Sequence, residues 1–471
     1  MNARPLCVDL DGTLVTTDLL WEGWFALLRQ NAPKALYAVT RLTSGRAAFK
    51  SFVASQVEID AATLPYNEAL LSGIKDAAAA GRRVALVTAS PKRWADAVAE
   101  HLDLFNDVLA TQDGKNLKGA DKARALVAAF GDKAFDYVGD SPSDLDVWKD
   151  AHSAWVVGGS AFARRVAGVS RVEQVFGPRK ARARDFIKCL RLHQWVKNIL
   201  ILVPIFGAHQ LANGKLLAAS LAAIFAFGCV ASANYLLNDL LDIQHDRHHT
   251  KKRNRPLAAG VVTVPAAVSL MLLLFFVGAI VASRLPIAFA ETLGLYTLGA
   301  LSYSLYFKRK APMDTFVLAG LYTLRVLAGN AATGIPPSFW LLAFSIFLFL
   351  SLAIAKRHAE LTRLIESEGS ETRGRGYLTA DREMISQLGV SAGYISVLVL
   401  ALYVNSPEAA LLYKRPTTLW LLCFLGLYWI TRLWLIAHRG QLHDDPVVFA
   451  IRDRTSQLTG LLAIALLYFA Q

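Results

Sequence analysis

The 471-residue chain is poor in cysteine and in charge. Its four cysteines are scattered and match no metal-binding spacing, which predicts buried thiols in a reducing compartment. Charged residues make up only 18% of the chain and hydrophobic residues 54%, whereas soluble domains average about 25% charged residues. This composition excludes a disordered chain and predicts membrane spans. No basic and apolar leader opens the sequence, so we expect the N-terminal part to stay in the cytoplasm.

The charge is distributed unevenly. Residues 1–178 carry 20 Lys and Arg against 21 Asp and Glu, whereas residues 179–471 carry 30 against 16. The hydrophobic part is therefore also the basic part, which is typical of loops near anionic headgroups or of sites for phosphorylated ligands. Because these charges lie between apolar runs, the pattern argues against nucleic-acid binding.

Residues 1–178 alternate short β-rich runs with helical stretches, which predicts a parallel α/β sheet. The expected strands are Leu6–Leu10, Arg83–Thr88, Asp107–Ala110, Phe135–Gly139 and Ala154–Val157. Polar signals follow where strands end, and ligands bind at that edge of a parallel sheet. They are Asp9-Leu10-Asp11-Gly12-Thr13, then Thr88, then the helix-start lysines Lys118 and Lys122, and then Gly139-Asp140-Ser141-Pro142-Ser143-Asp144.

This ordered set resembles the haloacid dehalogenase superfamily of phosphatases over about residues 5–160. The resemblance implies a Rossmann-like domain over 1–178 with a helical cap at about 15–80. It implies that Asp9 is the nucleophile and Asp11 the general acid and base. Thr88 and Lys122 would hold phosphate oxygens, with Lys118 as the alternative lysine. One Mg²⁺ would be held by carboxylates of Asp9, Asp11, Asp140 and Asp144.

From residue 196 onward, apolar runs recur at about the 20 residues that a bilayer requires. We expect nine transmembrane helices over 196–471, preceded by a basic linker at 179–195. With the N-terminus inside, the cytoplasmic loops hold 17 Lys and Arg and the outer loops 4. This agrees with the positive-inside rule and predicts a multi-pass protein of the bacterial inner membrane with a cytoplasmic phosphatase domain.

The candidate catalytic and metal-binding residues of this half lie mainly in the first expected cytoplasmic loop. Asn238, Asp242 and Asp246 recur every four residues, and Asp239 lies three before Asp242, so a helix would place these side chains on one face. Stacked carboxylates become useful when divalent cations bridge them to a diphosphate. The basic cluster 251–255 then supplies cations for the remaining phosphate oxygens.

The loop resembles the first aspartate motif of the UbiA-type intramembrane prenyltransferases, and the likeness covers about residues 185–471. Asp314 and Arg325, eleven residues apart, partly represent the second aspartate region, but Leu318 stands where a further acid is usual. Segments 190–198, 303–308 and 355–361 resemble the polyprenyl-phosphate phosphoribosyltransferases. The resemblance implies that Asp239, Asp242 and Asp246 hold one or more Mg²⁺ and a ribose diphosphate. The implied phosphate and substrate ligands are Lys197, Asn238, Lys252, Arg255, Tyr303, Lys308, Asp314, Arg325, Lys356 and Arg357.

The fusion predicts a two-step membrane enzyme. The first step would transfer 5-phosphoribosyl from phosphoribosyl diphosphate to a polyprenyl phosphate, and the phosphatase domain would then remove the 5-phosphate. One alternative is an aromatic prenyltransferase that uses a polyprenyl diphosphate, fused to a phosphatase with a separate substrate. Another is a membrane-tethered scaffold with degenerate domains, against which the intact aspartates argue. The sequence leaves homo-oligomerisation open.

Overall fold

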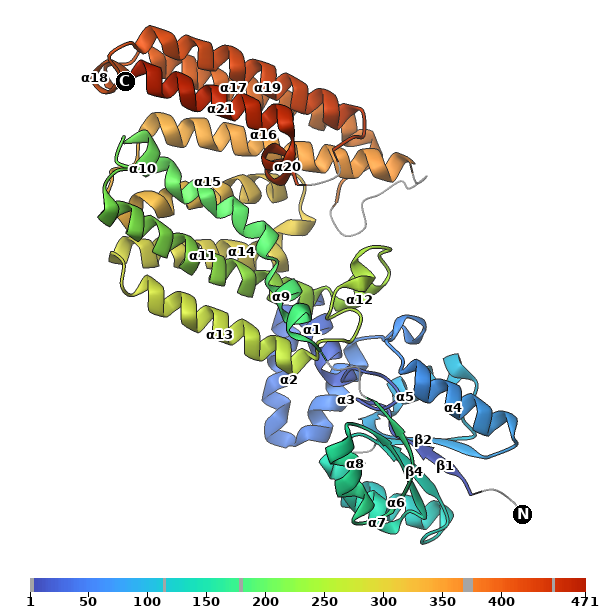
Figure 1. Ribbon diagram of the computed structural model, residues 1–471. Helices are drawn as coiled ribbons and strands as arrows, with labels where there is room; N and C mark the ends of the chain where they lie inside the picture. The colour runs from blue at the N-terminus through green and yellow to red at the C-terminus, as the bar shows by residue number, and fades with distance from the viewer. Residues whose placement is uncertain (1–3, 113–115, 178–180, 367–375, 443–444) are drawn as a thin grey trace. The chain divides into compact units, whose positions relative to one another are not determined.

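The computed structural model describes residues 4–112, 116–177, 181–366, 376–442 and 445–471 (Figure 1). The chain divides into two compact units. Unit 1 comprises residues 1–190 together with 235–271, and unit 2 comprises residues 191–234 and 272–471. Arg179 and Lys180 of the expected basic linker lie outside the described residues, whereas its later part forms helix α9 (Ala183–Leu190).

Unit 1 is built on a six-stranded parallel sheet with the order β3-β2-β1-β4-β5-β6. The strands are β1 (Leu6–Val8), β2 (Val84–Pro91), β3 (Asp107–Thr111), β4 (Asp136–Gly139), β5 (Ser153–Val157) and β6 (Arg171–Phe176). The first five were expected from the sequence. The edge strand β6 was not, because most of its side chains are exposed and it has no apolar run.

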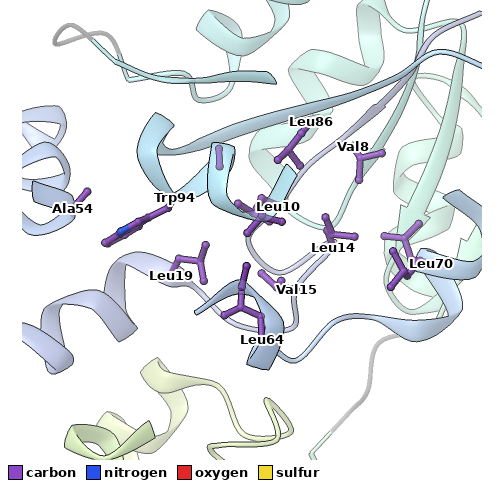
Figure 2. Packing of buried hydrophobic residues seen from close by; sticks show 14 of the residues in the cluster. Val8, Leu10, Leu14, Val15, Leu19, Ala54, Leu64, Leu70, Leu86 and Trp94 are labelled. Atoms are coloured by element: carbon purple, nitrogen blue, oxygen red, sulfur yellow. The ribbon is translucent and has the colours of Figure 1, made fainter. Parts of the chain in front are cut away.

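Both faces of the sheet are buried. Leu6 and Val8 of β1 belong to one apolar cluster, and Cys7 between them belongs to another, as period-2 alternation requires. Figure 2 shows part of the first cluster, in which Val8 and Leu86 come from the sheet, Leu10 and Leu14 from the loop after β1, and Leu19, drawn beside Trp94, from the following helix. Packing the loop after β1 in this way fixes the carboxylates that it carries.

The helices of unit 1 form a cap and the layers on the sheet. The cap consists of α1 (Leu19–Gln30), α2 (Ala32–Thr40), η1 (Arg41–Ser44), α3 (Arg46–Gln56) and η2 (Ala61–Thr63). The layers use α4 (Glu68–Ala79), α5 (Lys92–Leu102), α6 (Ala120–Phe130), η3 (Pro142–Asp144), α7 (Leu145–Asp150) and α8 (Ser160–Ala167). Residues 235–271 add α12 (Ile243–Arg247) and η5 (Lys252–Asn254) to the same unit.

Unit 2 is helical. Its long helices are α14 (Ile287–Leu305), α15 (Met313–Thr333), α16 (Phe339–Glu366), α17 (Arg382–Val404), α19 (Trp420–His438) and α21 (Arg454–Ala470). Helices α11 (Gly214–Leu241) and α13 (Val264–Ala282) each run from one unit into the other. The shorter elements are η4 (Leu192–Leu202), α10 (Val203–Gly207), η6 (Phe307–Arg309), η7 (Thr379–Asp381), α18 (Pro407–Leu412), η8 (Pro416–Leu419) and α20 (Pro446–Arg452).

The protein is a multi-pass membrane protein, but the expected nine spans are not confirmed. Within the described residues, six helical segments are long and apolar enough to cross a bilayer: 214–241, 264–282, 313–333, 339–365, 379–404 and 416–438. The expected first span, 196–211, is instead the 3₁₀ helix η4 followed by the five-residue α10, whose first turn contains Pro204. The last, α21, has 17 residues.

Candidate functional site

Three carboxylates meet where strands β1 and β4 end. One oxygen of each of Asp9, Asp140 and Asp144 lies within 4.8 Å of the others. Burial, followed by the charges of its two neighbours, raises the pKa of Asp140 to about 7. Burial likewise raises the pKa of Asp9 to about 6 against the opposing effect of Lys122. Oxygen ligands packed this closely fit a Mg²⁺ ion.

Lys122, on α6, is buried against this group. Its Nζ lies 2.8 Å from Asp9 Oδ1 and 3.7 Å from Asp144 Oδ1. Burial acts against the ammonium, but the carboxylates of Asp9 and Asp144 outweigh it and raise the pKa of Lys122. The rival residue Lys118 is exposed. Tyr137, which the sequence analysis missed, joins the set because its hydroxyl bonds to Lys122 and to Asp144, each at 2.9 Å.

Asp11 lies outside that group of three, on the cap side of the site. Its Oδ1 accepts a 2.8 Å hydrogen bond from the backbone N–H of Leu19, and its Oδ2 accepts one of 2.5 Å from Ser90. Thr88 is fully buried and donates to the same oxygen at 3.4 Å. Burial, with the charge of Asp18, raises the pKa of Asp11 to about 7. Ser90 could have been found from Thr88, since strand residues two apart share a face.

Gly12 has no room for a side chain. Its φ of +79° is left-handed, and an added Cβ would lie 2.4 Å from Asp140 Oδ2. The turn after β1 therefore brings the backbone directly against a carboxylate of the group. This close approach explains why glycine follows the two aspartates.

The aspartate motif at the end of α11 belongs to unit 1. Asp239, Asp242 and Asp246 are all buried. Arg255 Nη1 contacts Asp239 at 2.9 Å and Asp246 at 2.5 Å, and Lys252 lies 3.9 Å from Asp246. Asn238 donates to Asp242 at 3.2 Å. The expected continuous helix face is interrupted, because α11 ends at Leu241 and Asp242 stands at the N-cap position of the next helix, α12.

Unit 2 holds a cluster of cations around Asp445, another residue that the sequence analysis missed. Asp445 Oδ2 lies 2.8 Å from Lys197 Nζ and 3.1 Å from Lys356 Nζ, and the Tyr322 hydroxyl donates to the same carboxylate. Burial acts against the charge on Asp445, but the ammonium groups of Lys356 and Lys197 hold its pKa well below its usual range. No local pattern marks Asp445, because its partners are distant in sequence.

Arg325 and Asp314 occupy separate environments, although both lie on α15. The guanidinium of Arg325 is surrounded by the rings of Phe227, Tyr296 and Tyr322, with centroid distances of 4.9–5.4 Å. It also bonds to Asn198 at 3.2 Å.

Asp314 is fully buried and pairs with Arg357 at 2.5 Å. The remaining Arg357 nitrogens bond to Glu360 and to the hydroxyl of Tyr303, and Tyr377 donates to Asp314. These contacts indicate a structural role for the Asp314–Arg357 pair. Lys308, in η6, is half-buried.

An apolar cavity of about 750 Å³ lies within unit 2. Its lining comes from α10, α16, α17, α19 and α21 and includes Phe206, Leu348, Tyr403, Trp429 and Leu467. The volume falls in the range of about 300–1,000 Å³ that is usual for ligand pockets.

Comparisons with known proteins match both halves of the chain. Residues 201–456 match the model of the UbiA prenyltransferase family, and residues 6–149 match that of the haloacid dehalogenase-like hydrolases. An uncharacterized protein, y4nM, of Sinorhizobium fredii is 35% identical over 97% of this chain and 89% of its own length. Nodulation protein NoeC of Azorhizobium caulinodans is 36% identical over 60% of this chain and 91% of its own. The decaprenyl-phosphate phosphoribosyltransferase of Mycolicibacterium smegmatis is 29% identical over 62% of this chain and 96% of its own.

Proposed function

The chain belongs to the UbiA prenyltransferase family and carries a haloacid dehalogenase-like hydrolase domain before it, and from this premise we propose a two-step enzyme. It transfers 5-phosphoribosyl from phosphoribosyl diphosphate to a polyprenyl phosphate and then removes the 5-phosphate. The observation that carries the proposal is the fusion of a transferase domain, similar to decaprenyl-phosphate phosphoribosyltransferases, to a phosphatase-type site built around Asp9 and Lys122.

In the transfer step, an oxygen of the lipid phosphate attacks the anomeric carbon of the ribose as diphosphate leaves. Asp239, Asp242 and Asp246 would hold Mg²⁺, which would bind the diphosphate of the donor and supply neutralisation of its charge as it leaves. The carboxylates and the Asn238 amide are oxygen donors of the kind that Mg²⁺ prefers. Lys252 and Arg255, which already lie beside the aspartates, bind the remaining phosphate oxygens.

The lipid phosphate is bound by the cations of unit 2. Lys197 and Lys356 share Asp445, which fixes two ammonium groups side by side and leaves the trio with a net positive charge. Such a pair is suited to a phosphate monoester. The apolar cavity of unit 2 takes part of the polyprenyl chain, for which its aromatic and aliphatic lining is suited.

In the second step, Asp9 attacks phosphorus and forms an aspartyl phosphate, and the ribose 5-oxygen leaves with a proton from Asp11. Asp11 then takes a proton from the water that hydrolyses the aspartyl phosphate. Lys122 and Thr88 hold the phosphoryl oxygens. Mg²⁺ held by Asp9, Asp140 and Asp144 would screen the charge that opposes the attack.

Both steps take place on the cytoplasmic side of the inner membrane. The aspartate motif, within 235–271, packs in the same unit as the phosphatase domain, which supports one shared side for the two sites. The basic residues at 247–255 agree with a cytoplasmic location.

The test uses purified protein in detergent with Mg²⁺, ¹⁴C-labelled phosphoribosyl diphosphate and a polyprenyl phosphate. Wild type is expected to give labelled lipid without the 5-phosphate. The Asp9→Asn variant is expected to give labelled lipid that retains the 5-phosphate. No labelled lipid with either protein would reject this donor. A prenyl diphosphate with an aromatic acceptor would then be assayed. A 5-phosphate retained by both proteins would reject the second step alone.

A further inference from the structure

Helix α1 of the phosphatase cap contacts carboxylates at both of its ends, all within unit 1. At the N-terminus, the Leu19 N–H donates to Asp11 of the phosphatase site at 2.8 Å. At the C-terminus, Arg29 Nε lies 3.3 Å from Asp242 Oδ1 of the aspartate motif. The Arg29 and Asp242 side chains are only 12% and 10% exposed. The phosphatase cap therefore places a cation on the aspartate motif of the transferase.

A second ion pair fixes this arrangement. The guanidinium of Arg247 forms two hydrogen bonds with Glu22, of 2.8 Å and 2.5 Å, and the two side chains are 4% and 1% exposed. Arg247 Nε also donates to the carbonyl of Ala258 at 2.9 Å. Glu22 and Arg29 are seven residues apart, about two turns, so they share one face of α1. That face presents both side chains to the segment that carries the motif.

The backbone approaches closely in the same place. Gly260 has φ +63°, and an added Cβ would lie 2.2 Å from Thr16 Oγ1 and 2.9 Å from Pro65 Cγ. His248 Nε2 also lies 3.3 Å from Asp60 Oδ2. The segment 242–260 is therefore held against the cap at several points, so the Arg29–Asp242 contact is part of a built surface.

Cations from two segments of unit 1 contact the motif. Arg255, from the motif's own segment, contacts Asp239 and Asp246. Asp242 is contacted by Arg29, from the phosphatase cap. A guanidinium offers five N–H donors in a planar fork that matches phosphate oxygens. Contact with Asp242 and with a phosphate oxygen of a ligand beside it are therefore compatible.

We propose that Arg29 is a diphosphate-binding residue of the transferase, so that the docked phosphatase cap completes the transferase site. The inference rests on the proposed function in placing a diphosphate at the motif. It accounts for the fusion beyond simple proximity, because the transferase would bind its donor weakly without the cap.

Binding of Mg²⁺ and inorganic diphosphate to the full chain in detergent tests this by titration calorimetry. Arg29→Gln is expected to weaken binding at least tenfold, and Arg29→Lys, which keeps the charge but loses the fork, by a smaller factor. The matched control is Arg93→Gln, which removes an arginine of α5 that pairs with Glu58 on the surface of the same unit. It is expected to bind as wild type does. Melting temperatures identify any variant that fails to fold.

The proposal would be overturned if Arg29→Gln or Arg29→Lys folds and binds diphosphate as tightly as wild type. It would also be overturned if Arg93→Gln loses as much diphosphate affinity as the Arg29 variants. Because this measurement needs no lipid acceptor and no ribose, its result does not depend on the donor. Failure of the labelled-lipid assay and failure of the Arg29 assignment are therefore distinguishable.

Discussion

Lys197 Nζ donates a 2.8 Å hydrogen bond to Asp445, across 248 residues of sequence. The pair is buried, with side chains 7% and 10% exposed, and Lys356 shares the same carboxylate oxygen. Removing one partner of a buried ion pair is costly, because the remaining charge stays buried without compensation.

Asp445→Asn should therefore destabilise the protein by about 3–5 kcal/mol. Asparagine can still cap α20, as Asp445 does through Val447 N–H, so the substitution isolates the charge. Asp453→Asn is the control, because Asp453 caps α21 and pairs with Arg432 but is more exposed. Its expected cost is smaller, because the Arg432 and Asp453 side chains are 25% and 17% exposed and water compensates part of the lost interaction. Thermal unfolding in detergent measures both, and equal losses would contradict the prediction.

Gly12→Ala should abolish the phosphatase activity. Alanine at a left-handed φ costs about 1–2 kcal/mol wherever it stands, but at Gly12 its Cβ would also meet Asp140. Gly81 has nearly the same φ, +76°, with nothing within 4 Å of an added Cβ. Gly81→Ala should lose similar stability and keep hydrolysis of p-nitrophenyl phosphate. Activity retained in Gly12→Ala would show that the turn tolerates displacement of Asp140.

Tyr137→Phe should weaken Mg²⁺ activation of the phosphatase about tenfold. Its hydroxyl bonds to both Lys122 and Asp144, and removing it leaves two buried charged groups with one partner fewer, at about 1–3 kcal/mol. Tyr66→Phe is the control, because the Tyr66 hydroxyl bonds to the Ala61 carbonyl in the cap at 2.9 Å. The measurement is the Mg²⁺ concentration for half-maximal hydrolysis. An equal half-maximal Mg²⁺ concentration in the two variants would show that the Tyr137 hydroxyl does not contribute to the phosphatase site.

The phosphatase-type site was largely predictable from sequence because each part is local. Asp9 and Asp140 directly follow strands β1 and β4, Thr88 lies in the second half of β2, and strand ends in a parallel sheet meet at one edge. Tyr137 escaped prediction because a tyrosine inside a strand is an ordinary core residue. Arg29 and Asp445 escaped because nothing near them in sequence indicates a partner more than 200 residues away.

Less of the membrane half could be predicted from the sequence, because its spans and side-chain partners depend on helix packing. Hydropathy finds long apolar helices, but it cannot distinguish a span from the 3₁₀ segment over 192–202. Spacing placed Asp314 and Arg325 three turns apart on one helix. Their different partners, Arg357 for Asp314 and Asn198 with an aromatic cage for Arg325, depend on how the helices pack.

The Glu22–Arg247 pair should show strong coupling in a double-mutant cycle. Glu22→Gln or Arg247→Gln alone leaves a buried charge unpaired, and each should cost about 3–5 kcal/mol. Together they should cost much less than the sum, because no lone charge remains. The exposed pair Arg93–Glu58 is the control and should couple by at most about 1 kcal/mol.

Thermal unfolding of the full chain measures the cycle, and limited proteolysis within 242–262 reports local opening. Both single variants should be cleaved there faster than wild type, because each breaks the Glu22–Arg247 pair, and Arg247→Gln should be cleaved fastest because it also removes the hydrogen bond to the Ala258 carbonyl. Additive effects would mean that Glu22 and Arg247 do not interact in the folded protein. The cap would then not be held on the aspartate motif by this pair, and any effect of Arg29 would require another explanation.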